Sequence, residues 1–135
     1  MKVLLVDDEE AIVQVFTTAL QTGGIDVVSA TTGNEGIQKA QTEKPDVILL
    51  DQVLPDINGN QVLENLKNNE LTKNIPVAIL SNFSQDGLVQ EAMKLGASEY
   101  ILKYQIAATD LPNKVQQLAI RKEPTLPEEA NPEVV

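Results

Sequence analysis

Short apolar runs recur along this chain and constrain its fold more than any other feature. They stand at residues 3–6, 27–28, 47–50, 77–80 and 100–102, and most of their residues are Val, Ile or Leu. Strands that are buried on both faces of a parallel sheet have this composition. The runs therefore predict five buried strands.

The segments between the runs have helical spacing. Ile12, Phe16 and Leu20 share one face, and Gly23 provides a stop. Similar patterns follow residues 34 and 59, and two more begin at Leu88 and Leu111. Strands that alternate with helices at this chain length predict an α/β fold of the doubly wound (βα)5 type. We expect a five-stranded parallel sheet in the order 2-1-3-4-5, with ligands bound at the carboxyl ends of its strands.

Polar residues follow four of the five runs directly. Asp7 and Asp8 follow the first run, Asp51 the third, Ser81 the fourth and Lys103 the fifth. In the expected sheet these side chains share one edge. Carboxylates suit Mg²⁺, with Mn²⁺ as an alternative, and a carboxylate can attack phosphorus. A simpler interpretation is that Asp7 or Asp8 caps the first helix and that Asp51 begins a turn.

Composition excludes several classes of function. The 135 residues indicate one domain, and 20 acidic against 10 basic side chains give a net charge of −10. This charge disfavours binding to nucleic acid or to an anionic membrane. The absence of Cys and His excludes thiol chemistry, Ser-His-Asp catalysis and histidine-bound zinc within the chain. Without a signal peptide or a long apolar stretch, we expect a cytoplasmic protein.

Four motifs resemble the response-regulator receiver domain of two-component signalling. They are VLLVDDE at the start, LLDQVLPDING around residue 51, AILS at residues 78–81 and GASEYILK at residues 96–103. Each motif is weak alone, but their order along the chain is specific. The resemblance covers residues 1–121. Residues 122–135 are rich in Pro and Glu, which predicts a disordered tail or a linker.

The resemblance implies a role for each strand-end residue. Asp51 resembles the phosphoacceptor. Asp7 and Asp8 resemble the acidic pair that binds Mg²⁺, and the backbone carbonyl of Val53 matches a further ligand.

The remaining matches concern the phosphoryl group and the switch. Ser81 and Lys103 match the residues that contact the phosphoryl group. Tyr100 matches the aromatic switch residue, which responds when the hydroxyl of Ser81 moves. The usual output face of the family would include Val89, Met93, Lys94, Tyr100 and Tyr104.

The resemblance also implies partners. The phosphoryl donor would be a phosphohistidine on a sensor histidine kinase or a histidine phosphotransfer protein, which this chain without histidine cannot supply itself. The signal would pass to a downstream partner or a fused output domain. The chain would not be an enzyme beyond promoting its own phosphorylation and dephosphorylation. An alternative is a receiver-like scaffold that binds partners without phosphorylation.

Enzymes with the same architecture lack support in this sequence. A dehalogenase-type phosphatase would need an acid at position 53, which is Val, and a dinucleotide-binding domain would need GxGxxG after the first run.

Two positions depart from the family pattern. Tyr104 stands where the family usually has Pro after the lysine, and a cis bond before a non-proline residue costs roughly 3–4 kcal/mol. We therefore predict a trans bond between Lys103 and Tyr104. Asn82 and Phe83 follow Ser81 where a small residue is usual. We expect them, together with the apolar Val53, to slow the loss of the phosphoryl group to water.

Overall fold

The computed structural model describes residues 1–83 and 85–120, and it contains the expected parallel sheet. The five strands lie in the order β2-β1-β3-β4-β5, and every neighbouring pair is parallel. The expected tail at 122–135 lies outside the described residues. The elements in chain order are β1 (Lys2–Val6), α1 (Glu10–Thr22), β2 (Asp26–Ala30), α2 (Gly33–Glu43), β3 (Val47–Asp51), α3 (Gly59–Lys67), β4 (Val77–Ser81), α4 (Asp86–Lys94), β5 (Glu99–Leu102), a short 3₁₀ turn (Ala108–Asp110) and α5 (Leu111–Ile120).

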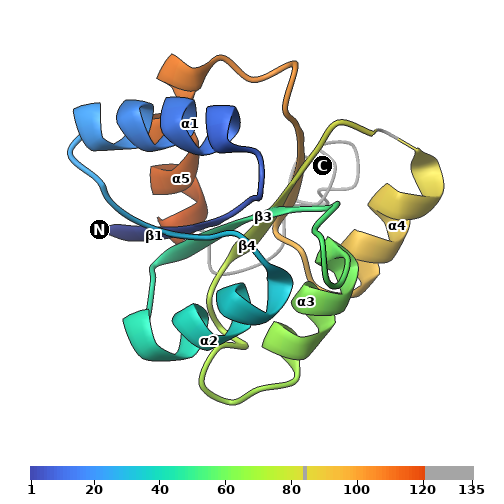
Figure 1. The fold of residues 1–135 in the computed structure, drawn as a ribbon. Coiled ribbons are helices and arrows are strands. Elements are labelled where there is room, and N and C mark those ends of the chain that lie inside the picture. Colours follow the sequence, from blue (N-terminus) through green and yellow to red (C-terminus); the bar gives the residue numbers. More distant parts are fainter. Residues whose placement is uncertain (84, 121–135) are drawn as a thin grey trace, which may run out of the picture.

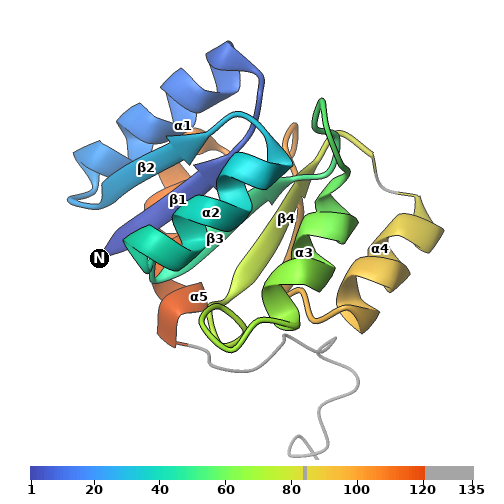
Figure 2. The same cartoon turned by 60° about the horizontal axis from the view of Figure 1, so that its bottom comes forward.

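Helices cover both faces of the sheet. Helices α1 and α5 lie on one face, and α2, α3 and α4 lie on the other (Figures 1 and 2). Successive strand residues point to opposite faces, so Val3 and Leu5 pack beneath α1 and α5, whereas Leu4 and Val6 pack toward α2 and α3. This burial on both faces explains why the strands read as unbroken apolar runs.

Local signals fix the helix ends. Helix α1 ends before Gly23, as its sequence predicts. The side chain of Thr32 accepts a hydrogen bond from the backbone of Glu35 and caps α2. Asn58 and Gln61 form a reciprocal capping box at the start of α3. These caps begin α2 and α3 close to the carboxyl edge of the sheet.

The described residues contain no cis peptide bond, so the bond between Lys103 and Tyr104 is trans, as predicted. Within those same residues, no helix is long and apolar enough to cross a membrane.

Candidate functional site

The register of the sheet aligns the strand ends. Asp51 of β3 pairs with Leu80, and Ser81 of β4 pairs with Leu102. Just beyond β5, the backbone N–H of Lys103 donates to the carbonyl of Ser81 at 2.9 Å. Side chains from separate parts of the sequence therefore converge at this edge.

Asp7, Asp8 and Asp51 form a carboxylate cluster at this edge. Each offers an oxygen within 4.8 Å of those of the other two. Asp7 and Asp51 are buried, whereas Asp8 is exposed. Neither Asp7 nor Asp8 occupies the N-cap position of α1, which belongs to Glu9. The geometric prediction from the strand ends is confirmed, while the roles of these residues remain predictions.

Lys103 projects into the cluster. Its Nζ lies 2.7 Å from Oδ2 of Asp7 and 3.1 Å from Oδ1 of Asp51. A third carboxylate, Oε1 of Glu9, lies 2.8 Å from the same nitrogen. Glu9 is not among the residues that the sequence pattern predicts for the site, because an acid before a helix is a common favourable feature of a helix N-terminus. Its position directly after the acidic pair was the available signal.

Burial and charge set the protonation of the site. Burial raises the pKa of Asp51 from 3.8 to about 6, and the charge of Asp7 adds to this rise. The charge of Lys103 and the backbone N–H of Val53 oppose the rise without cancelling it. Burial alone would lower the pKa of Lys103, but its contacts with Asp7, Glu9 and Asp51 hold that pKa above its ordinary value. At neutral pH, Asp51 is thus largely an ionised carboxylate beside a firmly cationic lysine.

Phe83 connects the two residues that the sequence assigned to the switch. Its backbone N–H donates to Oγ of the buried Ser81 at 2.9 Å. Its carbonyl accepts a hydrogen bond from the Tyr100 hydroxyl at 3.1 Å. The Phe83 side chain itself is 47% exposed. Ser81 and Tyr100 are therefore joined through the backbone N–H and C=O groups of one residue, Phe83, in the loop after β4.

The loop between β3 and α3 is anchored at two points. Asp56 accepts hydrogen bonds from the backbone N–H groups of Gly33 at 2.8 Å and Asn34 at 2.9 Å, so it caps α2 from a distant loop. These bonds lower the pKa of Asp56. At Gly59, an added Cβ would lie 2.6 Å from the carbonyl oxygen of Asp51. Only glycine permits this close approach.

A buried amide network starts at Gln52, directly after Asp51. The side chain of Gln52 accepts from the backbone of Asn60 at 3.0 Å and donates to its side chain at 3.2 Å. Asn60 then donates to Oε1 of Glu91 on α4 at 2.9 Å. The sequence pattern does not predict this connection, because Gln52 and Asn60 have the character of ordinary loop and helix-start residues.

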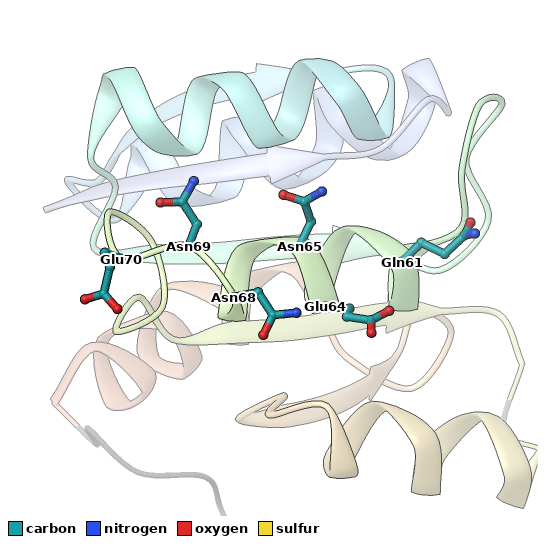
Figure 3. A pocket seen from close by; sticks show the side chains of 6 residues that line it. All are labelled: Gln61, Glu64, Asn65, Asn68, Asn69 and Glu70. Carbon is teal, nitrogen blue, oxygen red and sulfur yellow. The ribbon is translucent and has the colours of Figure 1, made fainter.

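Among the described residues, one hollow lies next to the site and another lies over α3. A groove of about 300 Å³ adjoins the site, and Gln52, Val53, Phe83 and Leu88 contribute to its walls. The other hollow, of about 540 Å³, lies over α3 (Figure 3) and is lined by Gln61, Glu64, Asn65, Asn68, Asn69 and Glu70. Gln52 and Val53 of the groove follow Asp51 directly in the chain, whereas the residues that line the second hollow begin at Gln61, so the groove is the hollow that bears on Asp51.

The carboxylate cluster fits a hard divalent cation. Oδ2 of Asp7 is buried without a hydrogen bond among the described residues, although it lies 2.7 Å from Nζ of Lys103. Carboxylate oxygens that gather without enough hydrogen-bond donors are suited to Mg²⁺ or Mn²⁺. Asp7, Asp8 and Asp51 are the residues that could hold the ion, and the backbone carbonyl of Val53 stays a predicted further ligand.

Comparisons with known proteins agree with this geometry. Residues 3–116 match the family model of the response regulator receiver domain. The chain is 38% identical over 102 residues to the alkaline phosphatase synthesis transcriptional regulatory protein PhoP of Bacillus subtilis, covering 76% of this chain and 42% of PhoP. It therefore spans less than half the length of that relative.

Solved structures share the fold. A CheY-like receiver domain protein from Methanospirillum hungatei has a TM-score of 0.81 and 27% identity, over 87% of this chain and 92% of its own. The Mn²⁺-bound form of response regulator Rcp1 has a TM-score of 0.74 and 27% identity, over 92% of this chain and 99% of its own. From its motifs, its sheet order and the family match over residues 3–116, the chain belongs to the receiver domains of two-component response regulators.

Proposed function

We propose that this receiver accepts a phosphoryl group on Asp51 from a phosphohistidine of a partner protein. The observation that carries the proposal is the convergence of three carboxylates within 4.8 Å, with Nζ of Lys103 3.1 Å from Oδ1 of Asp51. A nucleophile, a place for a cation and a fixed ammonium are the parts that transfer to a carboxylate requires.

In the transfer, a carboxylate oxygen of Asp51 attacks phosphorus. The new O–P bond makes an acyl phosphate, and the P–N bond breaks with its electron pair passing to the imidazole of the donor. The pKa of about 6 leaves Asp51 mostly ionised at neutral pH and so able to attack. Lys103 and Ser81 would contact the phosphoryl oxygens. A bound Mg²⁺, held by Asp7, Asp8, Asp51 and Val53, would neutralise charge on those oxygens.

The wider assignment follows from the same proposal. Residues 1–121 would form the receiver, with a sensor histidine kinase or histidine phosphotransfer protein as donor. The phosphorylated form would signal through α4, β5 and α5, by way of Ser81 and Tyr100, to a downstream partner or a fused output domain. The chain would act in the cytoplasm and catalyse only the gain and loss of its own phosphoryl group.

The test is labelling by acetyl phosphate with Mg²⁺, followed by intact mass spectrometry. The wild type should gain one phosphoryl group that hydroxylamine removes, as expected for an acyl phosphate. Asp51→Asn should gain none. Asp56→Asn is the matched control, because it makes the same change in the loop that follows β3, and it should still be labelled. A wild type that resists labelling would instead favour the phosphorylation-independent scaffold.

A further inference from the structure

Glu9 contributes a carboxylate that the proposed phosphoryl transfer does not use. Its Oε1 contacts Nζ of Lys103 at 2.8 Å with hydrogen-bond geometry. Its backbone N–H donates to Oδ1 of Asp7 at 2.9 Å, which fixes the turn into α1. The Glu9 side chain is 50% exposed, whereas those of Asp7 and Asp51 are almost fully buried. Glu9 is therefore the solvent-side partner of Lys103.

Three carboxylates surround the ammonium of Lys103, and among the described residues its contact with Glu9 is the one that has hydrogen-bond geometry. A lysine ammonium carries three N–H donors, and three carboxylates lie within 3.1 Å of this one. A phosphoryl oxygen that binds Lys103 must therefore compete with these carboxylates for the ammonium. Asp51 carries the incoming group and Asp7 is buried in the cluster, so Glu9, which water can solvate, is the partner that gives way.

We infer that Glu9 is a positioning residue that holds Lys103 while Asp51 is unmodified and competes with the phosphoryl group for the ammonium. The inference rests on the proposed function. Removing the charge of Glu9 should have two opposite effects. It should tighten binding of a phosphoryl mimic, because Lys103 is released and one repelling charge is lost. It should weaken binding of Mg²⁺, because the cluster becomes less negative. A merely structural defect would weaken both.

The experiment uses the full chain, labelled with ¹⁵N and freed of metal, in two NMR titrations. Mg²⁺ is added first, and beryllofluoride, a phosphoryl mimic, is then added at saturating Mg²⁺. Glu9→Gln should bind beryllofluoride about two- to fivefold more tightly than the wild type, the range expected for a half-exposed charge pair. Its affinity for Mg²⁺ should fall by a similar factor.

The matched control is Glu10→Gln, which makes the same charge change one residue later, at an exposed position in the first turn of α1. It should change either affinity by less than Glu9→Gln does. The side-chain ammonium signal of Lys103 in the metal-free protein is an independent measurement. This signal should move in Glu9→Gln and stay in place in Glu10→Gln.

A second variant guards against misfolding. Glu9→Asp keeps the charge but shortens the side chain by one methylene, so it should loosen Lys103 while weakening Mg²⁺ binding less than Glu9→Gln does. The inference is overturned if both Glu9 variants bind beryllofluoride no more tightly than Glu10→Gln, or if the Lys103 signal is the same in all four proteins. A wild type that binds Mg²⁺ but neither beryllofluoride nor a phosphoryl group overturns the proposed function, and the inference with it.

Discussion

Asp51→Asn is expected to stabilise the metal-free protein, and to do so more strongly at neutral than at acidic pH. Asp51 is only 4% exposed, and burial together with the charge of Asp7 raises its pKa from 3.8 to about 6. Folding therefore favours the protonated form of Asp51. The stability that this preference contributes is fully present below about pH 3.8 and is lost as the pH rises through about 6. Asparagine cannot ionise and escapes that loss.

The size of the effect follows from the two pKa values. At about 1.36 kcal/mol for each pH unit, a rise from 3.8 to about 6 corresponds to about 3 kcal/mol. Linkage then gives a cost of ionising Asp51 in the folded chain of about 1 kcal/mol at pH 4.5 and about 3 kcal/mol at pH 7.5. The second figure corresponds to a rise in Tm on the order of 10 °C for a domain of this size.

The assay is urea unfolding of the wild type and Asp51→Asn at pH 4.5 and pH 7.5, with a chelator present. Asp56→Asn is a control with the opposite sign. The pKa of Asp56 is lowered by the backbone N–H groups of Asn34 and Gly33, so the stability that it contributes is present at neutral pH and lost as the pH falls. Asp56→Asn should therefore be less stable than the wild type, chiefly at pH 7.5. The reasoning is refuted if Asp51→Asn gains no stability at pH 7.5, or gains as much at pH 4.5.

Other substitutions test the remaining parts of the site. Gly59→Ala should lower the free energy of unfolding by about 2 kcal/mol, because its Cβ would lie 2.6 Å from the carbonyl oxygen of Asp51. In Gly87→Ala the Cβ meets nothing within 4 Å, so the same urea measurement should show a gain of up to about 1 kcal/mol. Mg²⁺ at about 100 times its Kd should stabilise the wild type by about 2.7 kcal/mol. Asp8→Asn should need more Mg²⁺ for the same rise in Tm, and an equal requirement would contradict a ligand role. Asn82→Ala should shorten the half-life of phosphorylated Asp51 by opening a path for water; an unchanged or longer half-life would count against this.

The sequence was sufficient to predict the fold and the convergence of the strand ends. Parallel strands that are buried on both faces leave a clear apolar pattern, and their shared direction places Asp7, Asp51, Ser81 and Lys103 at one edge. This prediction needs only the order of the elements. It does not depend on the conformation of any loop.

The contacts that the sequence did not predict depend on loop conformation. Glu9 reaches Lys103, 94 residues away, only because of the turn that its own backbone makes with Asp7. Asp56 caps a helix that begins 23 residues before it, and neither segment carries a sequence signal that predicts the contact. Polar side chains in such loops can hydrogen-bond to water instead of to protein groups. Their protein partners are therefore set by the folded backbone and cannot be predicted from sequence periodicity.

Two chains of hydrogen bonds lead from the vicinity of Asp51 to the region of α4. One passes from Gln52 through Asn60 to Glu91, on α4 itself. The other joins Ser81 and Tyr100 through Phe83, in the loop that leads into α4.

A hydroxyl of Ser81 that turned toward a phosphoryl group on Asp51 would disturb the bond from Phe83. The carbonyl of Phe83 accepts the hydrogen bond from the Tyr100 hydroxyl, so a shift of the Phe83 backbone would reach β5 as well. Within the described residues, Ala92 is the one residue of α4 that is fully buried. Little apolar packing therefore opposes a shift of this helix. Weak packing and two polar connections together support the proposal that α4 and β5 form the surface that would change after phosphorylation.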